Sequence, residues 1–352
     1  MLTALSSNAI LAKAKTMFGR RLTDQDYTDL LHCHTVTEVA AYLKKETAYA
    51  RTFAAVNERN IHRGELEIYL KTKLLNDYAA LCRYELSVGE HFSNYLIRRG
   101  EIEQILHCLR LLNAGKIQEY LFTLPVFFNS HTDLDLFALA KVRTFQEFLD
   151  ALGTSKYREI LEQYAPTEEH PSPDFALIEN ALFLYLFSGV FDVIKNHSRG
   201  ALREELLEHF GRQVDFLNML RIDRLKRHFG ASPDAVRSMV MPFYYLIPPK
   251  VLTRMIDAES ADAAQDIFRT TPYRKMMEKY PDAGPEDLFS LSMYDFSRKK
   301  MYFSTHPSVV MLSYISFMEI ELENIIKIIE GIRYGLPKEE LAGMIIGYKN
   351  KS

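Results

Sequence analysis

Residues 318 to 333 read MEIELENIIKIIEGIR, and this stretch decides the fold class. One apolar stripe has the alternating spacing of a long packed helix: Met318, Leu322, Ile325, Ile329 and Ile332. A second stripe lies on another face: Phe317, Ile320, Asn324, Ile328 and Gly331. A helix that is apolar on two faces packs against neighbours on more than one side. We therefore predict a buried helix in which the amide of Asn324 needs a hydrogen-bond partner and Gly331 allows another backbone to approach closely.

The residues that follow predict a helix end and a new helix start. Gly335 is typical of the position just past a helix, and Pro337 of the first turn of the next one. Glu339 and Glu340 then lie near the positive end of the new helix. The segment Phe229-Gly230-Ala231-Ser232-Pro233 repeats this arrangement earlier in the chain.

Two short patterns recur three times in the same order along the chain. The first is a small or hydroxyl-bearing residue two places before a tyrosine: Thr47 and Tyr49, Ser155 and Tyr157, Thr271 and Tyr273. The second is an amide followed by apolar residues, at Gln104, Asn218 and Asn324. The tyrosines are 157 − 49 = 108 and 273 − 157 = 116 residues apart, and the amides 218 − 104 = 114 and 324 − 218 = 106 apart. A common period of roughly 110 residues predicts triplication of a domain-sized unit.

Helical spacing dominates elsewhere too, for example in residues 35–45 and 65–75, and strand-like alternation is absent. The predicted fold class is all-α. Proline-containing segments at 124–135 and 241–250 suggest boundaries, which give three domains: 1–127, 128–245 and 246–352. The longest apolar run, residues 181–191, is too short to span a bilayer and predicts a buried core helix.

Composition and motifs exclude several classes of function. A net charge of −3 argues against a general nucleic-acid binder. Phosphate-binding, dinucleotide-binding, nucleophile-elbow and zinc-protease motifs are all missing, so we predict no catalytic residue, no cofactor and no small-molecule substrate. His32-Cys33-His34, even with Asp29, does not complete a zinc ligand set, and a helix end near Thr35 is the better interpretation.

The C-terminal run resembles a known family. The pattern E-x-E-x-x-N-I-x-x-I-x-x-G from Glu319 to Gly331, with the run Tyr334 to Glu340 after it, is similar to the C-terminal signature of the C-type subunit of prokaryotic V/A-type rotary ATPases, whose eukaryotic counterpart is the d-type subunit. The segments around Tyr49, from Glu65 to Glu67, and from Asp215 to Arg221 are also similar to that family. Lys13 and Lys15 depart from it, because they stand where an arginine-containing pattern is expected.

This resemblance implies a non-catalytic protein of three helical domains, arranged as a funnel about an approximate threefold axis. In that family the protein lies peripherally on the cytoplasmic face of the membrane. It links the rotor shaft, made of D- and F-type subunits, to the membrane proteolipid c-ring, and the membrane stator is a further potential contact. It thereby couples ATP hydrolysis or synthesis to transport of an ion, proton or sodium, which the ring selects.

The resemblance and the repeats together give a set of candidate partner-binding or family-signature residues: Tyr49, Glu67, Asn218, Arg221, Glu321, Glu323, Asn324 and Gly331. A structural interpretation competes at most of them. The asparagines can tie neighbouring helices together, the recurring tyrosines can pack at helix corners, and Glu323 can pair with Lys327 on the helix surface. The alternative function is a free-standing helical-repeat scaffold for soluble partners.

Overall fold

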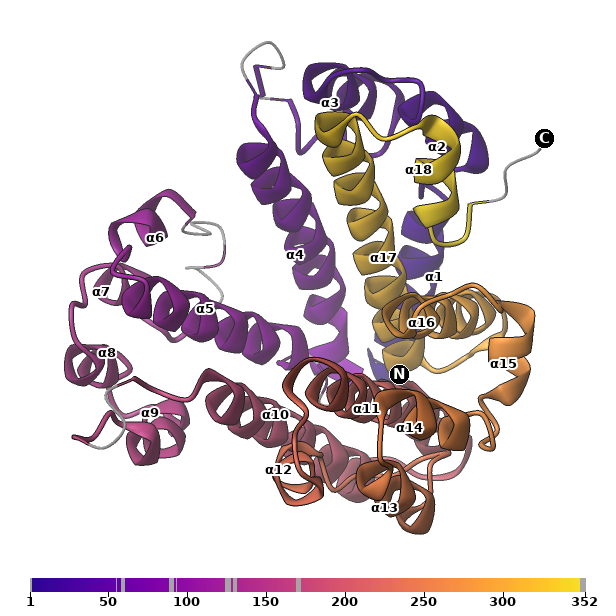
Figure 1. Ribbon diagram of the computed structural model, residues 1–352. Coiled ribbons are helices and arrows are strands. Elements are labelled where there is room, and N and C mark those ends of the chain that lie inside the picture. Colours follow the sequence, from indigo (N-terminus) through magenta and orange to yellow (C-terminus); the bar gives the residue numbers. More distant parts are fainter. Residues whose placement is uncertain are drawn as a thin grey trace. The chain divides into compact units, whose positions relative to one another are not determined.

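The computed structural model describes residues 2–54, 56–57, 61–88, 92, 94–123, 128, 132–168 and 172–348. Every regular element in these ranges is helical, with 18 α-helices and a short 3₁₀ helix, which confirms the predicted all-α class (Figure 1). The chain divides into two compact units. The first contains Met1–Glu90, Gly200–Phe216 and Pro272–Ser352, and the second contains His91–Arg199 and Leu217–Thr271. Helix α11 (Gly200–Phe229) contributes residues to both.

The first unit is built around one long helix, α17 (Pro307–Tyr334). Its neighbours are α1 (Leu2–Phe18), α3 (Val36–Glu46), α4 (Arg63–Val88), α16 (Pro285–Phe303) and α18 (Lys338–Met344). Two short helices, α2 (Asp24–Leu30) and α15 (Arg274–Lys279), complete the unit. Figure 1 shows α17 between α4 and α16. Both predicted apolar stripes of α17 are largely buried, so this helix packs on more than one side as expected.

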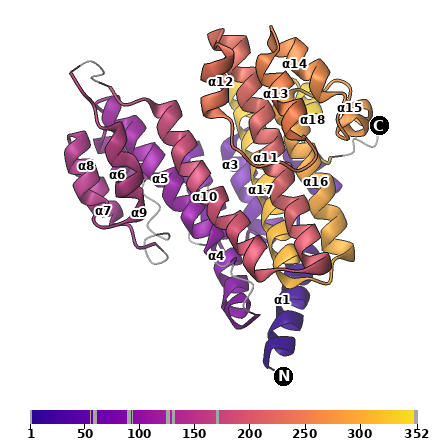
Figure 2. The same ribbon diagram turned by 90° about the horizontal axis from the view of Figure 1, so that it is seen from below.

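The second unit begins with α5 (Tyr95–Asn113) and α6 (Gln118–Thr123). Short helices follow: α7 (Leu136–Leu139), α8 (Phe145–Ala151), α9 (Lys156–Leu161) and the 3₁₀ helix η3 (Glu162–Tyr164). The long helix α10 (Phe175–His197) packs against α5, as Figure 2 shows. After α11 come α12 (Pro233–Met239), α13 (Pro249–Asp257) and α14 (Ala261–Phe268).

Helix α10 contains the apolar run predicted to form a core helix, and it is buried mainly along one face. Five of its six buried residues recur every four positions, namely Ile178, Leu182, Leu186, Val190 and Ile194, and Phe187 adjoins them. The helix is longer than the run itself, with 23 residues, and its most apolar window has a mean hydropathy of 1.7. By length and composition it is the one helix of the described residues that could cross a membrane, and a third of that window is buried inside the protein. A core helix meets the same criterion, so this feature does not establish a membrane span.

Three long helices end in the same way, which agrees with the repeat seen in the sequence. Gly115, Gly230 and Gly335 follow α5, α11 and α17 with φ of 66°, 54° and 66°. In this left-handed conformation a side chain would be strained, and glycine is not. A short helix comes next each time, α6, α12 or α18. The predicted boundary between residues 127 and 128 falls at the edge of residues 124–127, which lie outside the described residues, so the three-domain division and the funnel stay predictions.

Candidate functional site

Each recurring tyrosine donates a hydrogen bond to a buried carboxylate on a long helix. The three acids are nearly inaccessible to solvent, at 7% for Glu101, 1% for Asp215 and 2% for Glu321. The oxygen–oxygen distances are 2.8 Å for Tyr49 and Glu321, 2.7 Å for Tyr157 and Glu101, and 2.9 Å for Tyr273 and Asp215. The acid and its tyrosine lie in different predicted domains each time. These bonds therefore tie together segments that are far apart in the sequence.

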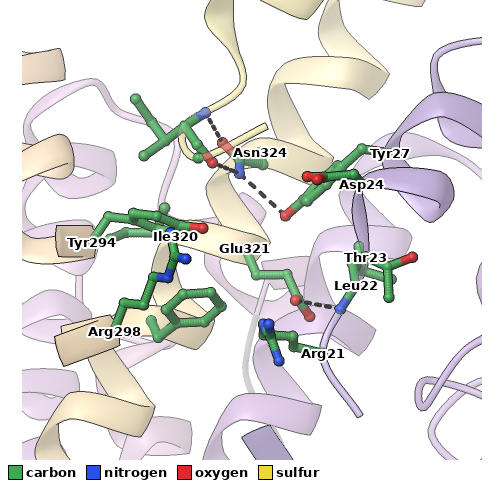
Figure 3. Close-up of a pocket in the computed structure, with 13 residues that line it drawn as sticks. Arg21, Leu22, Thr23, Asp24, Tyr27, Tyr294, Arg298, Ile320, Glu321 and Asn324 are labelled. Atoms are coloured by element: carbon green, nitrogen blue, oxygen red, sulfur yellow. Dashed lines mark hydrogen bonds between the residues drawn. The ribbon is translucent and has the colours of Figure 1, made fainter. Parts of the chain in front are cut away.

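The amide of each long helix stands three residues after its acid. Asn324 accepts a bond from the Ile346 N–H and donates one to the Ile346 carbonyl, both at 2.9 Å. Asn218 makes the same pair of bonds with Met241, again at 2.9 Å. Asn324 Nδ2 also donates to the Tyr27 hydroxyl at 3.2 Å (Figure 3). Each asparagine side chain thus pairs with the N–H and the carbonyl group of one residue in the segment that follows the short helix, as another backbone would.

Gln104 forms a side-chain bond within the described residues. Its Oε1 accepts a bond from the Tyr120 hydroxyl at 3.2 Å. The segment that would correspond to Met241 and Ile346 falls within residues 124–127, which lie outside the described residues. The sequence patterns identified the amides and tyrosines, but the acid Glu101 was missed. The sequence contains a signal that could have identified it: an acid stands three residues before the amide in all three cases, at positions 101/104, 215/218 and 321/324.

Glu321 is surrounded by several polar and charged groups. Burial raises its pKa, although the Tyr49 hydroxyl, the Leu22 N–H at 2.8 Å, and the charges of Lys73 and Arg21 act to lower it. Burial and the nearby Glu321 charge raise the pKa of Tyr49 well above its ordinary value. The pair is therefore a donor hydroxyl facing a desolvated carboxylate.

A second polar group joins α4 and α17 beside this pair. Lys73 Nζ lies 2.6 Å from Asp77 Oδ2 and 5.0 Å from the centre of the Tyr49 ring. The Tyr314 hydroxyl donates to the same Asp77 oxygen at 2.6 Å. Burial, with the Asp77 charge, raises the pKa of Tyr314. Hydrogen bonds and charge contacts thus run without a break from Asp77 to Tyr49 and on to Glu321.

The first unit also contains a pocket next to Glu321 (Figure 3). Its volume is about 270 Å³. Arg21 and Leu22 from the connection between α1 and α2 line one side, and Tyr294 and Arg298 of α16 line another. Residues of α2, of α17 and of the segment after α18 also line it. Two of the candidate residues, Glu321 and Asn324, therefore line one hollow.

The other candidate residues lie apart from this pocket. Glu67 accepts a bond from Arg63 Nε at 2.6 Å, and the same arginine reaches Glu330 at 2.8 Å. Arg221 donates to the Asn180 side chain at 2.6 Å and to the Met239 carbonyl at 3.1 Å, and burial lowers its pKa. Both residues therefore have structural partners within their own unit.

Glu323 is exposed on α17, and the predicted partner Lys327 lies 3.3 Å from Asp287 Oδ1 and 3.2 Å from the Met344 carbonyl oxygen. Gly331 permits the predicted close approach. A Cβ added there would stand 1.9 Å from the side chain of Leu341 on α18. The approaching group is a side chain, whereas the sequence led us to expect a backbone segment.

His32 and His34 border a helix start, as the sequence predicted. Thr35 caps α3 through its side chain, and the His34 N–H donates to Glu38 at 2.7 Å. His32 Nδ1 lies 2.7 Å from the Thr28 carbonyl oxygen. Lys13, which departs from the family pattern, donates to the Ala80 carbonyl on α4 at 3.2 Å. Among the described residues, no group of three or more histidine, cysteine or acidic side chains is arranged to hold a metal ion.

Comparison with known proteins agrees with the earlier resemblance. Residues 10–344 match the family model described as ATP synthase (C/AC39) subunit. A similar curated protein is the C subunit of the A-type ATP synthase of Archaeoglobus fulgidus, 21% identical over 343 residues, which cover 96% of this chain and 95% of that protein. The match extends over nearly the full length of both chains. The chain belongs to the ATP synthase (C/AC39) subunit family of V/A-type ATPases.

Proposed function

We propose that this chain is the central-stalk subunit that links the rotor shaft to the membrane proteolipid ring. The observation that carries the proposal is the family match over residues 10–344. A relative named as the C subunit of an A-type ATP synthase aligns from end to end. Such a match is expected for a protein with the same place in a complex.

The packing of the first unit suits a part that transmits torque. Close-packed helices transmit strain, and fully bonded buried polar groups add rigidity. Here, Tyr49 and Glu321 join segments 272 residues apart in the sequence, and Tyr314 and Asp77 join segments 237 residues apart. We propose that these ties keep the protein stiff while partner contacts form on other surfaces.

The proposed partners are the D- and F-type shaft subunits and the proteolipid c-ring, with the membrane stator as a further contact. The proposed location is the cytoplasmic face of the membrane, in peripheral association. No catalytic step is assigned to any residue of this chain. Its role is to couple ATP hydrolysis or synthesis to ion movement, while the identity of the ion, proton or sodium, is set elsewhere in the complex.

Membrane fractionation tests this proposal. A tagged full-length chain is expected to sediment with membranes and to co-purify with the proteolipid ring and shaft subunits after mild detergent extraction. A high-salt wash should release it, since a peripheral protein is held by surface contacts. If the chain is found only in the soluble fraction, with no proteolipid, the alternative of a free-standing scaffold is favoured and the proposal fails.

A further inference from the structure

The C-terminal end of α16 exposes two adjacent aromatic side chains. Tyr302 is 54% exposed and Phe303 is 79% exposed, the largest fraction among the large apolar side chains of the described residues. Their ring centres lie 6.4 Å apart, and the Tyr302 ring lies 5.8 Å from Phe18 of α1. The two rings therefore form a small continuous apolar surface, in contrast to a single exposed residue.

Contacts with α11 hold this end of α16 in place. The Ser304 hydroxyl donates to Glu205 at 2.6 Å, and Lys300 Nζ lies 3.1 Å from Glu205 and 3.0 Å from Glu208. The His306 N–H, at the start of α17, donates to the Ser304 hydroxyl at 3.2 Å. The aromatic pair thus stands next to a fixed turn. A contact surface that is ordered in advance loses less conformational entropy on binding.

Two exposed cations precede the aromatic pair on the same helix. Arg298 and Lys299 have no ion pair within the described residues. Residues four apart in a helix are neighbours, so Arg298 adjoins Tyr302 and Lys299 adjoins Phe303. These four side chains form one basic and aromatic surface, which we name the α16 end face.

The acids near the α16 end face are already paired or balanced. Asp295 lies 2.7 Å from Lys279, and the two acids of α11 bind Lys300. The pocket beside Glu321 is lined by two acids and two arginines, one of them Arg298, so the pocket adds no net charge. On the first turn of α11, the exposed charges of Arg203 and Glu204 cancel. None of these groups therefore supplies an excess of negative charge.

Positive charge is in excess outside the pocket. Residues 1–23 and 296–306 contain no acid, whereas acids average one in about eight residues of the whole chain. The contact between Phe18 and Tyr302 brings the ends of these two segments together. Three exposed cations of these segments do not line the pocket: Lys15, Arg20 and Lys299. This end of the first unit is therefore both basic and aromatic.

We propose that the α16 end face, with the basic residues at the end of α1, contacts a membrane surface of anionic lipids. Aromatic rings enter the headgroup region of a bilayer, and lysine and arginine side chains bind the lipid phosphates beside them. A purely polar partner would leave the Phe303 ring uncovered, and a purely apolar one would leave Lys299 without a counter-ion. The inference rests on the peripheral location given under the proposed function and adds lipid to the contacts of the chain.

Sedimentation with vesicles tests the proposal, using the purified full-length chain at low salt. We expect saturable binding to vesicles of phosphatidylglycerol and phosphatidylcholine in equal parts, and much weaker binding to phosphatidylcholine alone. Binding should weaken about tenfold or more in Y302S/F303S, because the apolar contact is lost, and in R298Q/K299Q, because two charges are lost. The single variant F303S, at the most exposed position, should weaken binding several-fold with an unchanged circular dichroism spectrum.

Two matched controls are expected to bind like the wild type. F229S/Y334S removes two other aromatic side chains, which are 70% and 72% exposed. K250Q/R254Q removes one exposed lysine and one exposed arginine of α13. Equal weakening in these controls would overturn the proposal, because attraction would then follow overall charge or apolarity.

Two further results would also overturn the proposal. One is the absence of saturable binding to the anionic vesicles, or equal binding to phosphatidylcholine alone. The other is co-purification with the proteolipid ring that is lost in Y302S/F303S while the wild type binds no vesicles, which would assign the face to a protein partner. Loss of vesicle binding with retained ring association would leave the proposed function intact, so the two failures are distinguishable.

Discussion

Replacing Asn324 with alanine should loosen the segment that contains Ile346. The change removes two 2.9 Å bonds to the backbone of Ile346 and a 3.2 Å bond to Tyr27. Ile346 is 7% exposed, so its N–H and carbonyl group would lose their partner in a buried place. Each unsatisfied buried group costs about 1–3 kcal/mol, so the two together give roughly 2–6 kcal/mol.

Water in the pocket next to Asn324 should keep the destabilisation in the lower part of this range. Water can enter a polar hollow of about 270 Å³ and partly replace the lost bonds. We therefore expect about 2–4 kcal/mol of local destabilisation for Asn324→Ala. Asn218→Ala, which removes the matching bonds to Met241, should cost as much or more, since Met241 is 1% exposed.

Hydrogen exchange followed by mass spectrometry measures this directly. A cost of about 2 kcal/mol corresponds to roughly thirtyfold faster exchange. In Asn324→Ala the acceleration should be confined to peptides covering residues 338–348, and in Asn218→Ala to residues 233–245. The control Gln163→Ala removes an exposed amide that bonds to the Ile160 carbonyl and should leave both regions unchanged. An acceleration of less than about threefold in the asparagine variants would refute the reasoning.

Three further outcomes follow from the same contacts. Tyr49→Phe should lower the free energy of unfolding by about 1.5–3 kcal/mol in urea titration, because the lost bond has a carboxylate acceptor; a loss below about 0.5 kcal/mol would contradict this. Burial raises the pKa of Glu321 in the folded state above its ordinary value of about 4.3. At pH values between these two pKa values the folded protein binds more protons at Glu321 than the unfolded protein does. The contribution of Glu321 to stability therefore falls as pH rises through this window. Glu321→Gln should therefore remove that decline from a plot of thermal midpoint against pH, and an unchanged plot would show that Glu321 does not titrate in this window. Gly331→Ala should lower the free energy of unfolding by about 1–3 kcal/mol, because the added Cβ would meet the Leu341 side chain. Gly343→Ala, where an added Cβ has nothing within 4 Å, should be neutral or stabilising. Equal thermal midpoints for the two glycine variants would contradict the packing argument.

The sequence predicted several of the helices and some of their ends, because these depend on local chemistry. The two stripes of residues 317–332 predicted α17, and Gly335 and Pro337 marked the end of one helix and the start of the next; Pro337 is the residue that caps α18. The spacing of the tyrosines and amides also predicted equivalent corners. The stripes and helix ends depend on residues within a few turns of one another, whereas the corners follow from the repeat period of roughly 110 residues.

The partners of those corner residues could not be predicted in the same way. Tyr49 bonds to a carboxylate 272 residues away, and periodicity carries no information on such a pairing. Asn218 and Asn324 bond to backbone groups, which any residue type could supply. The pocket of Arg21 and Arg298 was missed because its lining comes from separate stretches of sequence. The burial of α10 along mainly one face likewise depends on what packs against it.

Coupling is the central claim, and stripping and restoring the chain tests it most directly. The chain is removed from membranes that carry the assembled ATPase, and ATP hydrolysis and ion uptake are measured in the same vesicles before and after adding it back. We predict that removal abolishes ATP-driven ion uptake while the released catalytic part still hydrolyses ATP, and that the purified chain restores uptake. Ion uptake that continues at the same rate without the chain would contradict the coupling role.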